Sequence, residues 1–207
     1  MNFIYTKLLS NKFNNIKDHR ICGPIKAVEY LAHLSKKNHN FLTKFIHQNV
    51  YKLRNINSYL NWCNHKMVGT LINCDINNNH HKIIATEWYT LFCKEVNVDY
   101  NPNRIINLMT EKNLYFLTIN TRIVSMAAFA GLTDKIVRIG YVYTPINERR
   151  KGYATHLTGQ ICIMLEKQEN KECWLFADKS VKASNKTYIN VGFILNDQYS
   201  MLTLQTS

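Results

Sequence analysis

One stretch in the middle of the chain, residues 140–155, passes from an apolar strand pattern through a basic loop into a helix. Tyr141, Val142 and Tyr143 have strand composition, and Pro145 ends the strand because its nitrogen carries no hydrogen for a sheet. Apolar residues then recur at helical spacing, at Leu157, Ile161, Met164 and Leu165. A chain with these elements in this order folds as layers of strand and helix together.

The loop between the strand and the helix carries residue types that suit a phosphate. Arg149, Arg150 and Lys151 supply positive charge, Gly152 lets the backbone approach a ligand closely, and Ala154 keeps the helix start uncluttered. The first N–H groups of a helix have no partner within the helix, so they attract an anion. The stretch therefore predicts a binding site for a phosphorylated cofactor.

The pattern Arg149-x-x-Gly152-x-Ala154 after such a strand resembles the acyl-CoA pyrophosphate loop of the GNAT superfamily of acetyltransferases. The later segments 174–178, 184–188 and 191–193 look like that family's following strand, helix and Gly-Phe ending. Residues 124–128 look like one of its central strands. The resemblance covers about residues 85–207, with three matches in the family's order.

This resemblance implies an α+β protein with the GNAT-like acyl-CoA N-acyltransferase fold, in which helices flank a central mixed sheet. It implies an enzyme that transfers an acetyl group from acetyl-CoA to an amine of a small molecule or protein through a ternary complex. Backbone of residues 142–144 would stabilise the tetrahedral oxyanion, a contribution of about 3–4 kcal/mol in comparable sites. The implied cofactor-binding residues are Val142, Tyr143, Thr144, Arg149, Arg150, Lys151, Gly152, Tyr153, Ala154, Thr155 and Asn185.

The resemblance also points to Tyr188 as the acid that protonates the departing thiolate. A phenol has a reference pKa of about 10, close enough to that of a thiol for this transfer. The alternative is a core aromatic residue whose hydroxyl only contacts the cofactor. Asn185, one helical turn earlier, either binds the cofactor or caps the start of its helix.

The sequence identifies no general base. Many relatives carry a Glu on the strand before the loop, and this chain has none there. Asp134 and Glu148 are expected to be solvated loop acids, His156 is expected to be structural or close to the cofactor, and a water relay is equally possible. The loop also departs from the family, with Arg150 where Gly is usual and Ile146 where close relatives have a second Pro.

The rest of the chain is divided by the same periodicity arguments. We expect a basic, mostly helical extension over residues 1–70 and the GNAT-like domain over residues 71–207. An irregular segment is expected over 55–66, and Asn120-Thr121 signals a hairpin. Helices are expected from Pro24 to Leu34 and over 41–53, 87–96, 104–109, 152–168 and 184–191; strands are expected over 67–74, 114–119, 122–130, 136–144, 173–178, 193–196 and 199–204.

Charge is concentrated at the N-terminal side of the sequence. The formal net charge is +12, and residues 1–70 carry 11 Lys and Arg residues against 2 Asp and Glu. Such an excess marks either a surface for nucleic acid or a composition biased toward Lys and Asn. Two alternatives to the amine acetyltransferase therefore stay open: a GNAT-type toxin that acetylates aminoacyl-tRNA, and a non-catalytic acyl-CoA-binding module.

The six cysteines do not have the spacing of a disulfide framework, and no apolar run approaches the length of a membrane span. The N-terminus lacks the pattern of a secretory signal, so we expect a cytoplasmic protein. Zinc sites favour tight Cys-x-x-Cys pairs. The scattered set Cys63, His65, Cys74, His80 and His81 has none, and we expect no metal.

Overall fold

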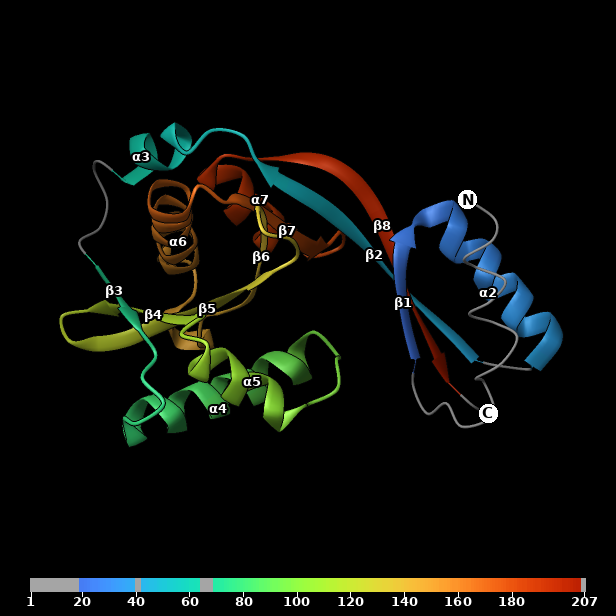
Figure 1. Ribbon diagram of the computed structural model, residues 1–207, viewed down its shortest axis with the longest axis horizontal. Coiled ribbons are helices and arrows are strands. Elements are labelled where there is room, and N and C mark those ends of the chain that lie inside the picture. The colour runs from blue at the N-terminus through green and yellow to red at the C-terminus, as the bar shows by residue number, and fades with distance from the viewer. Residues whose placement is uncertain (1–18, 40–41, 64–68, 206–207) are drawn as a thin grey trace. The chain divides into compact units, whose positions relative to one another are not determined.

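The computed structural model describes residues 19–39, 42–63 and 69–205, and its elements are labelled in Figure 1. Contacts divide the chain into two compact units, which are described separately. The first comprises Met1–Asn49, Asp178–Ser180 and Asp197–Ser207, and the second comprises Val50–Ala177 and Val181–Asn196. The predicted border between an extension and a catalytic domain at residue 71 stays a prediction.

The described strands form one mixed sheet with the order β1-β8-β2-β7-β6-β5-β4-β3. β6 and β7 are parallel, whereas the pairs β1/β8, β3/β4, β4/β5 and β5/β6 are antiparallel. With helices against the sheet, this architecture confirms the predicted α+β class. The strands are β1 (His19–Pro24), β2 (Leu42–Leu53), β3 (Thr70–Asn73), β4 (Leu114–Ile119), β5 (Arg122–Gly131), β6 (Ile136–Tyr143), β7 (Glu172–Asp178) and β8 (Phe193–Gln205).

Helices cover both faces of the sheet in the second unit (Figure 1). Along β5, Ala127 and Phe129 belong to the core under α6 and α7, while Met126 and Ala128 belong to the core under α4 and α5. This alternation follows from the period of two in a strand. The helices are α2 (Ile25–His39), α3 (Asn57–Cys63), α4 (Asn79–Glu95), α5 (Pro102–Thr110), α6 (Tyr153–Glu169) and α7 (Lys182–Val191), with a 3-10 turn at η2 (Ile146–Glu148).

Local signals set the ends of several elements. Asn120 and Thr121 have φ of 48° and 67°, the left-handed pair that a two-residue hairpin turn needs, so the predicted hairpin between β4 and β5 is confirmed. The Asn78 side chain accepts from the backbone N–H groups of His80 and His81 and so caps α4. α4 therefore begins earlier than the predicted start at residue 87.

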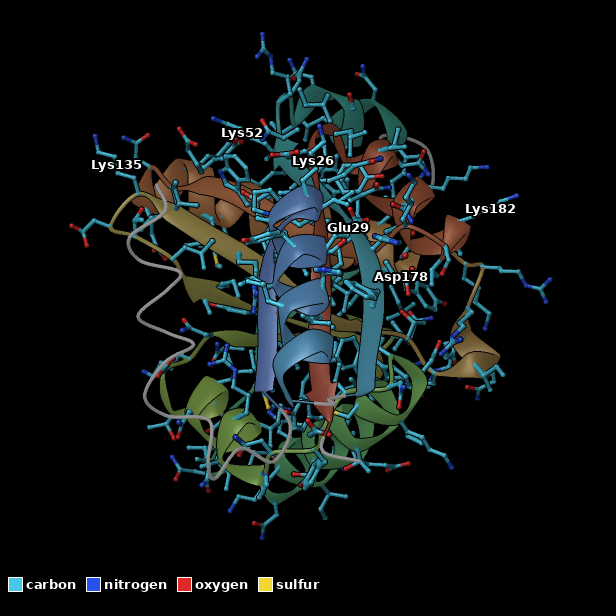
Figure 2. The ribbon with its side chains drawn as sticks, turned by 90° about the vertical axis from the view of Figure 1, so that its right-hand side faces the viewer. Lys26, Glu29, Lys52, Lys135, Asp178 and Lys182 are labelled. Atoms are coloured by element: carbon cyan, nitrogen blue, oxygen red, sulfur yellow. The ribbon has the colours of Figure 1, made fainter. Side chains whose placement is uncertain are left out.

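The first unit contains the α2 helix against strands β1, β8 and the first part of β2 (Figure 2). Val28, Ala32 and Leu202 form its buried core, and Phe45 packs against them. Lys26 and Glu29, on the other side of the helix, are exposed. The hydroxyl of Ser200 on β8 lies 2.8 Å from Nδ1 of His47 on β2.

Three predictions about elements are wrong. The helix predicted over 41–53 is the strand β2, from Leu42 onward; Phe41 lies outside the described residues. The segment expected to be irregular over 55–66 contains α3. The two strands expected over 193–196 and 199–204 are one continuous strand, β8. Leu42, Phe45, Ile46, Val50 and Leu53 fit a helical stripe, but pairing with β8 and β7 outweighs that local pattern.

Among the described helices, none combines the length and the apolar character that crossing a bilayer requires.

Candidate functional site

β6 separates from its parallel neighbour before it ends. Pairing with β7 runs from Ile136/Glu172 to Ile139/Leu175, whereas pairing with β5 continues to Tyr143/Met126. Within the described structure, the backbone of residues 140–143 is therefore not paired on its β7 side. N–H and C=O groups on that side are available to an extended ligand, which can add to the strand as a further strand would.

A bulge lies in this free part of β6. Tyr141 has a φ of 53°, and the register with β5 shifts between Met126 and Ala128. As a result, the odd-numbered residues change face: Val137 and Ile139 pack toward α6, whereas Tyr141 and Tyr143 pack toward α4 and α5 and Val142 packs toward α6. Two carbonyls at the end of the strand are used internally: Ser125 donates to the carbonyl of Tyr143 at 3.0 Å, and Arg149 Nε donates to that of Thr144 at 2.8 Å.

The basic loop turns twice through the left-handed backbone region before α6 begins. Arg150 has a φ of 63°, and Gly152, the residue before α6, has a φ of 85°. Gly adopts this region without strain, whereas a residue with a side chain, such as Arg150, does so at an energetic cost. No side chain caps the start of α6, so its first N–H groups are directed at the loop and can bind an anion.

The Arg149 side chain is engaged by the protein. Its guanidinium donates to both carboxylate oxygens of Glu95, the last residue of α4, at 2.9 and 2.6 Å. It also lies 5.8 Å from the centre of the Tyr143 ring. The hydrogen bond with Glu95 raises the pKa of Arg149 above its already high ordinary value, so the residue is charged at any working pH.

Glu148 is not the solvated loop acid that the sequence predicts. Its side chain is buried, and its carboxylate binds Lys151 at 2.8 Å and Arg122 at 3.1 Å. The hydrogen bond from Lys151, with the Arg122 charge, holds the pKa of Glu148 below its usual value despite burial. A carboxylate so stabilised is a poor general base. Asp134 is exposed, as expected.

Tyr188 lies on α7 in the core beneath α6. It is 8% exposed, and its ring centre lies 6.3 Å from those of both Tyr51 and Phe193. Burial raises the pKa of Tyr188 to about 12. Asn185 accepts a hydrogen bond from the Tyr51 hydroxyl at 2.8 Å and donates to the carbonyl of Val181 at 2.7 Å. Val181 occupies the capping position of α7, so the alternative that Asn185 caps the helix is wrong.

His156 has a structural environment. It is buried, its Nδ1 lies 2.9 Å from the Tyr59 hydroxyl and 3.5 Å from Cys63 Sγ, and Gln160 donates to its Nε2 at 2.9 Å. Burial lowers the pKa of His156, which keeps the ring neutral at pH 7. A Cβ at the nearby Gly159 would collide with the Tyr59 ring, so this position requires glycine.

No group of three or more metal-ligating side chains occurs among the described residues. Of the scattered Cys and His set, Cys63 contacts His156, His81 Nδ1 accepts from the backbone N–H of Asp75, and His65 lies outside the described residues. A hollow of about 520 Å³ opens elsewhere, near the start of α4, and none of the predicted site residues lines it.

No model of a protein family matches the sequence, and no curated protein matches it. Solved structures do match the fold. A GNAT-family protein of Novosphingobium aromaticivorans has a TM-score of 0.60 at 11% identity, covering 92% of this chain and 74% of its own. An acetyltransferase of the GNAT family from Colwellia psychrerythraea has a TM-score of 0.56 at 11% identity, covering 93% of this chain and 66% of its own. An N-acetyltransferase-like protein of Streptococcus suis has a TM-score of 0.55 at 12% identity, covering 88% and 76%.

The protein has the GNAT acetyltransferase fold. The strand, loop and helix that suggested the GNAT resemblance are the consecutive elements β6, the loop at 144–152, and α6. The fold places Val142, Tyr153 and Tyr188 at one core cluster.

Four residues that contact the predicted site residues were not predicted from the sequence: Glu95, Arg122, Tyr51 and Ser125. No local signal could have found them, because each meets its partner across at least 18 residues of sequence.

Proposed function

We propose that this protein is an N-acetyltransferase that moves an acetyl group from acetyl-CoA to an amine. The observation that carries the proposal is the free backbone of β6, which leads directly into a loop and the uncapped start of α6. An acyl-CoA offers the matching chemistry, because its pantetheine arm has amides for the strand and its pyrophosphate has charge for the helix.

The chain's own groups would serve each part of the reaction. The amine nitrogen attacks the thioester carbonyl, the C–N bond forms, and the C–S bond breaks as the oxyanion collapses. A backbone N–H of residues 142–144 would donate to that oxyanion, a contribution of about 3–4 kcal/mol. The strand is fixed by its pairing with β5, so this donor needs no reorganisation.

Tyr188 is the proposed donor of the proton that the leaving thiolate takes up. With a pKa of about 12, its phenol stays protonated at neutral pH. The same shift makes it a weaker acid than a phenol in water, so the transfer requires a direct hydrogen bond between the hydroxyl and the thiolate. The amine loses its proton to water, because Glu95 and Glu148 are held in ion pairs.

Thiol release from acetyl-CoA, measured across a panel of amines, tests the proposal. Turnover with at least one amine, above the rate of hydrolysis without amine, is the expected result. Binding of acetyl-CoA without turnover on any amine would favour the non-catalytic acyl-CoA-binding module instead. The proposed setting is cytoplasmic, where thiols stay reduced, and Cys63, Cys74, Cys93, Cys162 and Cys173 are free thiols.

A second candidate acceptor is an amine carried on RNA. It is favoured by two cation–aromatic pairs across the neighbouring strands β2, β7 and β6. Lys52 lies 5.5 Å from the ring centre of Trp174, and Arg138 lies 5.6 Å from that of Phe176. Aromatic rings flanked by cations on a sheet are typical of surfaces that stack unpaired bases. A salt-sensitive gel shift with aminoacyl-tRNA, weakened in Trp174→Ala, would support this acceptor; no shift at low salt would remove it.

A further inference from the structure

Two ion pairs fasten the basic loop to other parts of the second unit. Arg149 is bound on three sides: by both carboxylate oxygens of Glu95, by the carbonyl of Thr144, and by the ring of Tyr143. Glu95 lies 54 residues earlier in the chain, at the end of α4. A bidentate pair of this kind fixes both the position and the plane of the guanidinium.

Glu148 forms the second ion pair that holds the loop. Its buried carboxylate binds Lys151 from the loop and Arg122 from the start of β5. Two of the three successive loop cations, Arg149 and Lys151, therefore have their charge matched by a carboxylate. Arg150 between them is exposed, and no described carboxylate forms an ion pair with it.

We propose that Glu95 is a positioning residue for the phosphate loop. Its carboxylate fixes the Arg149 side chain and thereby the backbone of the loop. The loop then keeps its two left-handed residues and presents Arg150 and the start of α6 to the anion. Arg149 and Lys151 then support the loop, and Arg150 is the cation that meets the phosphate. This inference rests on the proposed function, because the anion it concerns is the pyrophosphate of an acyl-CoA. Its physical basis is preorganisation: a loop held in its binding conformation loses less entropy when the ligand arrives.

The direction in which one substitution changes acetyl-CoA affinity distinguishes this positioning role from a purely electrostatic effect of the Glu95 charge. Glu95→Gln removes a negative charge near an anion site and releases Arg149. If Arg149 were a phosphate ligand held back by Glu95, acetyl-CoA would bind more tightly. If Glu95 positions the loop, acetyl-CoA should bind about tenfold more weakly. Glu169→Gln, which removes a negative charge at the exposed far end of α6, is the matched control and should leave affinity unchanged.

Affinity is measured by isothermal titration calorimetry with acetyl-CoA at several salt concentrations, beside melting of each variant without ligand. Arg150→Gln should weaken binding and flatten its salt dependence, because a direct cation–phosphate contact is lost. Glu95→Gln should weaken binding and keep the wild-type salt dependence. Glu95→Asp keeps the charge but shortens the reach, so it should also weaken binding.

Unchanged or tighter binding in Glu95→Gln, or wild-type affinity in Glu95→Asp, overturns the positioning role. An Arg150→Gln variant with the wild-type salt dependence overturns its role as the phosphate cation. Failure of the wild-type protein to bind acetyl-CoA at all would instead remove the proposed function. The two failures are thus distinguishable. Glu95 has half of its side chain exposed, so its substitutions leave the buried core intact.

Discussion

The hydroxyl of Tyr51 on β2 donates a 2.8 Å hydrogen bond to Oδ1 of Asn185 on α7, across 134 residues of sequence. The Tyr51 ring also packs against that of Tyr188, one turn further along the helix. A strand from the N-terminal third of the chain therefore orients the helix that carries the proposed acid. Tyr51 is a residue that the sequence pattern assigned to a helix.

Tyr188→Phe removes the phenolic oxygen and keeps the ring. If this hydroxyl protonates the thiolate, turnover should fall by about 10²–10⁴-fold while acetyl-CoA affinity changes little. A hydroxyl that only contacts the cofactor would show the reverse, with weaker binding and turnover kept at saturation. Steady-state kinetics and calorimetry together distinguish the two. Wild-type kinetics in Tyr188→Phe would remove it from the mechanism.

Acetyl-CoA at about 100 times its dissociation constant should stabilise the wild-type fold by about 2.7 kcal/mol, seen as a higher melting temperature. Gly152→Asp should abolish this rise, because it places a side chain and a negative charge at the start of α6. The φ of 85° at Gly152 also predicts a loss of about 1–2 kcal/mol in stability. Gly131→Asp, at the exposed last residue of β5, is the control. A wild-type acetyl-CoA response in Gly152→Asp would contradict the phosphate site.

Arg150→Gly should change stability and binding in opposite directions. The left-handed backbone at Arg150 costs an ordinary residue about 1–2 kcal/mol, which exceeds the backbone entropy that Gly adds, about 0.5–1 kcal/mol. The free energy of unfolding should therefore rise by up to about 1.5 kcal/mol, while acetyl-CoA binds more weakly. Urea unfolding and calorimetry measure both. Arg150→Ala should weaken binding without the gain in stability, and equal stability of the two variants would show that no strain is relieved.

His156 predicts a loss of stability in mild acid. Burial lowers its pKa below the ordinary 6.5, so the unfolded chain takes up a proton at a higher pH than the folded one does. The free energy of unfolding should therefore fall as the pH drops from 6.5 toward the folded-state pKa, and hold steady above 6.5. Urea unfolding at pH 7.5 and 5.5 measures the difference. His156→Gln should reduce it; an equal difference in both proteins would assign the effect to other groups.

Local patterns in the sequence were enough to predict most elements of the second unit. The hairpin at Asn120-Thr121, the strand before Pro145, the loop and the helix after Gly152 all depend on residues close together in the chain. Backbone preferences and hydrophobic periodicity act over that same range. The resemblance to the GNAT family rested on these segments, and the fold that it implied is the one observed.

The tertiary structure alone decided the residues that support the site. β2 is a strand because it pairs with β8 and β7, both more than a hundred residues later, and that outweighs its helical spacing of apolar residues. Glu95, Arg122 and Tyr51 reach Arg149, Glu148 and Asn185 only after the chain has folded. A side chain's own sequence neighbours determine its helix or strand, but long-range packing determines its ion pairs and hydrogen bonds. The predicted anion-binding loop could therefore be located from the sequence, whereas Glu95 and Arg122, which hold it through ion pairs, could not.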